Sequence, residues 1–201
     1  MNQNGRSMIE MLGVLAIIGV LSVGGISGYT KAMTKHKTNS TAEIMLTIAT
    51  NIQGISLRSK NYPDDLTAVA KKMKAIPNKA LSGSNLVNPF GGSIQLGGFG
   101  KGSIKKYFYV AMNGLPKNAC MELATGDYGS ALVYAGSGIF SNSVSGLANQ
   151  APENLKQSGA VCNNVGASGA YCLKQVMSPT LATKGCNCTN AGGCNVAIVM
   201  F

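Results

Sequence analysis

The stretch that decides the fold is residues 5–21, GRSMIEMLGVLAIIGVL, in which a long apolar run follows one basic and one acidic side chain. No charged residue occurs from Met11 to Thr30. Twenty helical residues at about 1.5 Å each extend for about 30 Å, the thickness of the hydrocarbon core of a bilayer. Glu10 lies at the entrance of this segment, one helical turn after Arg6. An ionisable group there is costly unless it is paired, so we expect Glu10 to have a function.

Two interpretations of this stretch differ in what Glu10 does. Arg6 and Glu10 are spaced i, i+4 and can pair on one helix, which contributes about 0.2–0.5 kcal/mol and makes the segment a plain signal anchor. Alternatively, the segment is a processing site. Gly5, then Glu10 as the fifth residue after it, then an uninterrupted apolar helix together resemble the type IV prepilin signature.

The resemblance to type IV prepilins implies a role for each of these residues. It implies that a prepilin peptidase cleaves between Gly5 and Arg6 and methylates the α-amine of Arg6. It also implies that Glu10 pairs with the amine of a neighbouring subunit in a helical filament. The chain departs from the family pattern in two respects, because Arg6 stands where most members have Phe or Met and because the five-residue leader carries no Lys or Arg.

The composition restricts the function classes. The chain has 201 residues, of which about 150 remain after the apolar arm, enough for one ordinary globular domain. The formal net charge is +10, although only 12% of the residues are charged. A basic surface can attract DNA, anionic lipid or acidic glycans, but solubility and subunit packing are the favoured explanation. With one histidine and seven acidic residues, and without a cofactor fingerprint, we expect neither an enzyme nor a bound cofactor or metal.

The cysteines indicate the compartment. All six follow residue 119, and an even, clustered set behind an export segment favours disulfides in an oxidising compartment, here the bacterial periplasm. Lys31, Lys35 and Lys37 follow the apolar segment and, by the positive-inside rule, would place the C-terminal side in the cytoplasm. We nevertheless place the C-terminal side in the oxidising compartment, because the six clustered cysteines are the stronger evidence. Prepilins, which the chain resembles, also tend to carry basic residues just after this helix.

The helical pattern continues beyond the apolar segment, from Lys31 to about Ser59, and becomes amphipathic. Ile44, Ile48, Ile52 and Ile55 form its apolar stripe at spacings of four, four and three. Glycines interrupt the apolar half, and they favour either close helix packing or local melting: Gly24, Gly25 and Gly28. His36, the only histidine, is not expected to be a ligand or a catalyst.

The segment after the long helix is expected to contain a short helix and then loops. Pro63-Asp64-Asp65 predicts a helix start with the aspartates as caps rather than catalysts, and Leu66, Val69, Ala70 and Met73 form its apolar side. Residues 77–92 are predicted to be a loop ending in the turn Asn88-Pro89-Phe90-Gly91-Gly92, followed by a strand at 93–96. That turn resembles the type IVb class of pilins. Residues 97–103 are predicted to be a hairpin loop, not a phosphate loop.

The remaining elements are predicted from local patterns. We expect strands at 107–112 and 131–134, a turn at Asn113-Gly114, helices at 116–124 and 171–177, and exposed loops at 136–159. A turn at 190–193 precedes the final run at 195–201, which is expected to be a strand in the middle of an antiparallel sheet.

Six cysteines allow 15 pairings, and the sequence alone does not choose among them. They are Cys120, Cys162, Cys172, Cys186, Cys188 and Cys194. A bridge between Cys162 and Cys172 would close a short loop. The resemblance implies that Cys120 bridges to Cys186 or Cys194. The spacing C-x-C-x5-C without a nearby histidine fits no standard zinc site.

The local patterns favour an α+β chain with a long N-terminal helix. The resemblance implies the type IV pilin fold, in which this helix packs on an antiparallel sheet with a disulfide-bounded surface region. We divide the chain into residues 1–5 (leader), 6–30 (membrane and assembly helix), 31–59 (amphipathic continuation) and 60–201 (globular head).

The resemblance implies that the protein is a pilus subunit. It would be held in the inner membrane, with its C-terminal domain in the periplasm, and would then be polymerised into an extracellular filament. Its implied partners are copies of itself, the prepilin peptidase, the assembly platform and ATPase, and membrane lipid. DNA or host-surface glycans are further candidates for its basic surface. The filament would serve adhesion, aggregation, conjugation or DNA uptake. The alternatives are a minor pilin or type II secretion pseudopilin, and a membrane-anchored periplasmic protein that binds glycan or DNA.

Overall fold

The computed structural model describes residues 6–56, 61–99, 105–129, 132–138, 161–163, 171–174, 177–188 and 193–201. The chain forms two compact units, Met1–Lys37 and Thr38–Phe201. The second unit contains the sheet. The expected leader, residues 1–5, lies outside the described residues, as do the predicted loop at 139–159 and most of the turn at 190–193.

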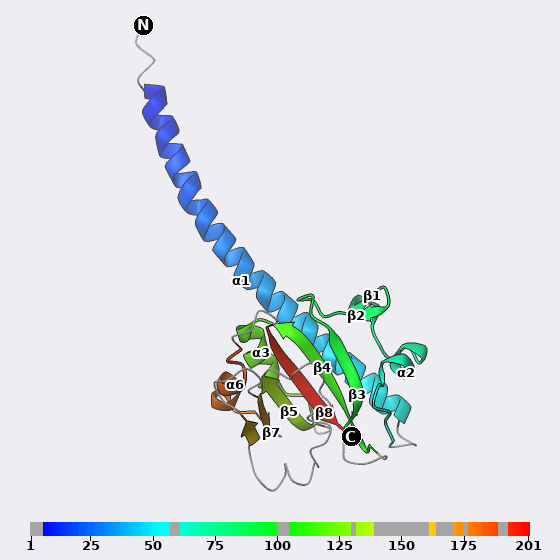
Figure 1. Cartoon of the computed structure of the whole chain (residues 1–201). Coiled ribbons are helices and arrows are strands. Elements are labelled where there is room, and N and C mark those ends of the chain that lie inside the picture. The colour runs from blue at the N-terminus through cyan, green and yellow to red at the C-terminus, as the bar shows by residue number, and fades with distance from the viewer. Residues whose placement is uncertain are drawn as a thin grey trace. The chain divides into compact units, whose positions relative to one another are not determined.

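The first helix, α1, spans Arg6–Ser56, so the two helical segments expected from the sequence are one continuous helix (Figure 1). In its second part, the predicted apolar stripe is buried at Ile44, Ile48 and Ile52, and Met45 and Ala49 are buried beside it. Ile55, expected in the same stripe, is 38% exposed. The stripe thus ends one turn before the helix does.

A six-stranded sheet with the order β3-β4-β8-β5-β7-β6 packs against this part of α1. Its strands are β3 (Ile94–Phe99), β4 (Tyr107–Leu115), β5 (Leu132–Gly138), β6 (Val161–Asn163), β7 (Tyr171–Lys174) and β8 (Cys194–Met200). Every neighbouring pair is antiparallel. β8 lies between β4 and β5, with Ile198 opposite Val110 on one side and Ala135 on the other. The prediction of a central final strand is confirmed.

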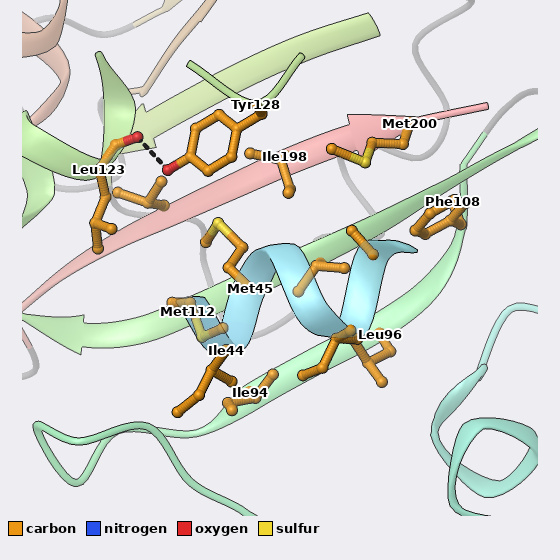
Figure 2. Packing of buried hydrophobic residues seen from close by; sticks show 14 of the residues in the cluster. Ile44, Met45, Ile94, Leu96, Phe108, Met112, Leu123, Tyr128, Ile198 and Met200 are labelled. Atoms are coloured by element: carbon orange, nitrogen blue, oxygen red, sulfur yellow. Dashed lines mark hydrogen bonds between the residues drawn. The ribbon is translucent and has the colours of Figure 1, made fainter. Parts of the chain in front are cut away.

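The core lies between α1 and the sheet. Ile44 and Met45 of α1 lie over Ile94, Met112 and Ile198 of three different strands (Figure 2). Each is nearly or fully buried. Burying a side chain of this size stabilises the fold by about 1.5–3 kcal/mol.

The short helix α2 spans Thr67–Lys72 and begins four residues later than Pro63, where the sequence predicted its start. The intervening residues do not form a helix, and their backbone bonds to β3 at the edge of the sheet. Leu66 N–H donates to the Leu96 carbonyl at 3.2 Å, and Gly98 N–H donates to the Pro63 carbonyl at 2.7 Å. The apolar side expected for α2 is only half buried, since Val69 and Met73 are 40% and 48% exposed.

The predicted hairpin loop at 97–103 is wrong at its start, because β3 continues through Gly97 and Gly98 to Phe99. A Cβ on Gly97 would lie 2.3 Å from the Asp64 carbonyl oxygen, and one on Gly98 would lie 2.6 Å from the Tyr62 carbonyl oxygen. These glycines therefore let the 62–66 segment lie against the sheet.

Other local predictions fail where long-range pairing decides the structure. The expected turn at Asn113-Gly114 is an irregularity inside β4, where the register with β8 shifts and Gly114 has a φ of 69°. The helix predicted at 171–177 is wrong because residues 171–174 form β7, which pairs with both β5 and β6. Residues 136–138, predicted as loop, are the end of β5.

Short helices and a small hairpin complete the described part of the fold. The predicted helix at 116–124 is confirmed as α3, Lys117–Ala124. The predicted loop at 77–92 also contains a 3-10 turn, η1 (Asn78–Ala80), and a small hairpin of β1 (Leu81–Ser82) and β2 (Asn85–Leu86). A helix that the sequence prediction missed, α6, spans Pro179–Gly185. Ser178 caps it, with Pro179 in its first turn, so the start signal was present in the sequence.

Candidate functional site

The N-terminal part of α1 carries a continuous apolar surface. Its large apolar side chains between Met8 and Tyr29 are 53–75% exposed. Its most apolar 18-residue window has a mean hydropathy of 2.2, with none of it buried. Among the described residues, α1 is the helix that is long and apolar enough to cross a membrane. An apolar surface of this extent indicates an interaction with lipid or with other protein chains.

Glu10 is the acidic group of this apolar surface. The structure places it in α1, one turn after Arg6, the first residue of the helix. Gly5 lies outside the described residues. A carboxylate at the edge of a helix that enters lipid or a packed bundle must be paired or hydrogen-bonded, which makes Glu10 a candidate for specific recognition.

The glycines of this region have open space around them. An added Cβ at Gly24, Gly25 or Gly28 would meet no heavy atom within 4 Å. Contacts within the chain therefore do not explain why these positions are small. Small residues do allow the backbone of a second helix to approach closely, which supports the packing interpretation.

The hydroxyls in the same region bond to their own helix. Ser22 donates to the Ile18 carbonyl at 2.7 Å, and Thr34 donates to the Thr30 carbonyl at 2.9 Å. Such bonds satisfy a hydroxyl without water, as an apolar surrounding requires.

Disulfides fix the second region that the sequence singled out. Cys120 of α3 is bonded to Cys186, just after α6, with a Cα–Cα distance of 5.8 Å. Cys188 is bonded to Cys194, the first residue of β8. Cys186 is thus the partner of Cys120 among the two expected, and the three cysteines of the C-x-C-x5-C spacing are all joined in disulfides.

The remaining pair of cysteines lies on neighbouring strands. Cys162 of β6 and Cys172 of β7 are register partners in the sheet. Their side chains lie outside the described residues.

The carboxylates considered as catalysts have structural partners instead. Asp64 forms an ion pair with Lys105. Asp65 accepts a hydrogen bond from the Thr67 N–H at 2.8 Å, and this bond lowers the pKa of Asp65 below its usual value. His36 is exposed on α1.

The Asn88 turn is a structural site that the sequence located correctly. The Asn88 side-chain oxygen accepts hydrogen bonds from the N–H groups of Phe90 and Gly92, at 2.9 and 3.2 Å. Its amide donates to the Asn113 carbonyl at 2.7 Å. The turn thereby ties the start of β3 to the irregularity in β4.

Sequence comparisons identify relatives with the same organisation. The PilS N-terminal family model matches residues 35–167, more than half of the chain. The major structural subunits of the bundle-forming pilus from Escherichia coli O111:H- and O127:H6 are each 26% identical over 157 residues, which is 77% of this chain and 81% of each relative.

Solved structures share the fold. TcpA, a type IV pilin from the Vibrio cholerae El Tor biotype, superimposes with a TM-score of 0.52 at 15% identity, over 83% of this chain and 99% of TcpA. A type IV b pilin from Salmonella typhi does so with a TM-score of 0.50 at 17% identity, over 80% and 97% of the two chains. A long helix packed on an antiparallel sheet is thus a fold that this chain shares with these pilins. The match to the family model over more than half of the chain shows that the chain belongs to the PilS family, and the solved structures show that it has the fold of type IV pilins.

Proposed function

We propose that this pilin is a structural subunit of a type IV pilus and polymerises through the N-terminal part of α1. The observation that carries the proposal is the apolar surface from Met8 to Tyr29, whose large side chains are exposed within the chain itself. Lipid can cover this surface before assembly, and copies of the same helix can cover it afterwards. We infer that the subunit moves from the inner membrane into an extracellular filament.

Apolar burial alone does not favour the filament over the membrane, because lipid tails are as apolar as the side chains of a neighbouring helix. A charge pair does distinguish them. Cleavage between Gly5 and Arg6 would create an α-amine at Arg6, and the Glu10 carboxylate of a neighbouring subunit can neutralise it. The pair is strongest in an apolar bundle from which water is excluded.

Processing and assembly bring further partners. A prepilin peptidase would cut after Gly5 and methylate Arg6, and an assembly platform with its ATPase would extract the subunit from the membrane. Open space at Gly24, Gly25 and Gly28 supports close helix packing in the filament.

The decisive experiment compares the two acidic residues of α1. Glu43 lies in the same helix and pairs with Lys79 at 2.6 Å on the surface of the head. Glu43→Gln is therefore a matched control for Glu10→Gln, since each removes one negative charge from one helix. We expect Glu10→Gln protein to stay in the membrane fraction and to be absent from sheared filaments, while Glu43→Gln assembles normally. Normal filaments from Glu10→Gln would overturn the role of Glu10.

The proposed cleavage after Gly5 and methylation of Arg6 can be tested directly. Mass spectrometry of filament protein should find an N-methylated Arg6 at the N-terminus. An intact N-terminus at Met1 in assembled protein would contradict cleavage after Gly5. The amount of this chain in sheared filaments also separates a major subunit from a minor pilin or pseudopilin, and the likeness to two major subunits supports the first.

A further inference from the structure

The positive charge of the chain is concentrated in one segment. No Asp or Glu occurs between Asp65 and Glu122, whereas eight lysines do: Lys71, Lys72, Lys74, Lys79, Lys101, Lys105, Lys106 and Lys117. From Thr67 to Leu115 this segment forms α2, the β1–β2 hairpin, β3 and β4, which gather on one side of the head, whereas Lys117 belongs to α3, which lies with α6 on the other side (Figure 1).

Some of these charges have partners. Lys79 pairs with Glu43, and Lys105 pairs with Asp64. Lys71 donates to the Ser84 carbonyl, a neutral acceptor that leaves its charge in place. Lys72 and Lys74 are exposed and form no ion pair with any residue in the described part of the chain. The C-terminal end of α2 therefore carries a cluster of three lysines. The nearby Asp65 carboxylate partly offsets the charge of Lys71, whereas Lys72 and Lys74 keep their charge without an ion pair among the described residues.

The backbone at Lys74 is unusual. Its φ is 54°, and it is the only non-glycine residue with a positive φ in the part of the chain that the structure describes. It follows the last turn of α2, which the hydrogen bond from Ala75 N–H to the Ala70 carbonyl closes at 2.9 Å. Glycine is the usual residue at such a position, and a residue with a Cβ costs about 1 kcal/mol there. The attraction of a lysine to the helix C-terminus offsets part of this cost.

We propose that Lys71, Lys72 and Lys74 bind the phosphate backbone of duplex DNA without sequence preference. Ammonium groups on flexible stems suit phosphates, which carry most of the affinity of sequence-independent binding. The exposed large apolar side chains beside them, Val69 and Met73, are aliphatic and offer no ring for stacking unpaired bases, which favours the duplex over a single strand.

Three phosphate contacts per subunit bind weakly, so the inference rests on the proposed function for its biological effect. A filament repeats the site along its length, and many linked weak sites raise the overall affinity without any new contact.

The test uses a double variant with opposite expected effects on stability and binding. Lys72→Gln/Lys74→Gly removes two positive charges, and its glycine also relieves the backbone at residue 74. Lys117→Gln/Lys184→Gln is the matched control, because it removes two charges from α3 and α6 on the other side of the head. Binding of a 30-bp duplex is measured at several salt concentrations, with sheared filaments and with the full chain in detergent.

We expect Lys72→Gln/Lys74→Gly to weaken binding about tenfold or more at 0.1 M salt and to reduce the salt slope by about 2, since each phosphate contact contributes about 0.9. Its thermal stability should equal or exceed that of the unmodified chain, which excludes unfolding as the cause. The control should bind nearly as well as the unmodified chain.

Several results would overturn the site. They are equal loss in both variants, undiminished binding by Lys72→Gln/Lys74→Gly, or binding of a sulfated polysaccharide but not of the duplex. Absence of DNA binding by the unmodified filament would do the same. Filament yield is scored separately, so a failure to polymerise counts against the proposed function, while the detergent-solubilised chain still tests the lysines.

Discussion

The two parts of α1 bury their apolar residues in different ways. From Thr38 onward, Ile44, Ile48 and Ile52 are covered by the sheet of the same chain. Before Lys37, side chains of the same kind, such as Ile17 and Leu21, remain exposed. One helix therefore contains a stretch whose burial is part of folding and a stretch whose burial must come from lipid or from other subunits. The first contributes to the stability of the head, and the second to association.

The glycines show the same contrast. Gly97 and Gly98 are small because backbone atoms of the 62–64 segment occupy the space of a side chain. Gly24 and Gly25 have no such neighbour within the chain. A glycine required by the fold can thus be distinguished from one that only another molecule can explain.

Truncating one isoleucine in each part of α1 should give the largest difference between the two parts in the free energy of unfolding. Ile48 is fully buried and Ile17 is 62% exposed. We expect Ile48→Ala to lower the free energy of unfolding by about 2–5 kcal/mol, because it removes buried methyl groups and leaves a cavity. Ile17→Ala should change it by less than about 0.5 kcal/mol. Urea unfolding of the full chain in detergent measures both, and equal losses would refute the division of the helix.

Replacing one glycine of each kind by alanine should change stability by a smaller amount, and the two changes should have opposite signs. Gly97→Ala places a Cβ against the Asp64 carbonyl and the Tyr109 ring, and we expect it to destabilise the head by about 1–3 kcal/mol. Gly25→Ala meets open space and should favour the local helix by up to about 1 kcal/mol. Urea midpoints report the first effect, and amide hydrogen exchange around residue 25 reports the second. An unchanged midpoint for Gly97→Ala would show that the 62–64 segment does not rest on this glycine.

Local patterns in the sequence predicted the elements that local physics determines. The isoleucine stripe from Ile44 to Ile52, the strand at 107–112, the helix after Pro116 and the Asn88 turn all follow from periodicity or turn chemistry. The spacing of Gly5 and Glu10 is likewise local, so the candidate assembly residues could be identified before the fold was known.

Predictions failed where partners that are distant in the sequence determine the structure of a segment. Residues 171–174 are a strand because β5 and β6 pair with them on both sides, and no pattern within the segment contains that information. Gly97-Gly98 was predicted as loop because glycines usually mark loops, yet here they accommodate a backbone more than 30 residues away in sequence. Cysteine pairing is non-local for the same reason, and only the fold brings Cys186 to Cys120.

Removing one hydroxyl group from each region should give the smallest difference in stability between the head and the exposed part of α1. The Tyr128 hydroxyl is buried in the head and donates to the Leu123 carbonyl at 2.5 Å, whereas the Ser22 hydroxyl bonds within its own exposed turn. We expect Tyr128→Phe to cost about 1 kcal/mol and Ser22→Ala almost nothing, because only the first removes a hydrogen bond that is buried in the head; the Leu123 carbonyl then keeps the Gly126 N–H as its donor, at 3.3 Å.

The pH dependence of the Tyr128 variant tests the burial of the phenol. Burial raises the pKa of Tyr128 above its ordinary value of 10.0. The folded chain then keeps its proton where the unfolded chain has lost it, so the stabilisation is complete below pH 10 and declines as the pH rises further. Above pH 10, the unmodified chain should lose stability more steeply than Tyr128→Phe, by up to about 1.4 kcal/mol per pH unit. Parallel curves for the two proteins would mean that the phenol ionises as easily in the head as in the unfolded chain, and that burial does not hold its proton.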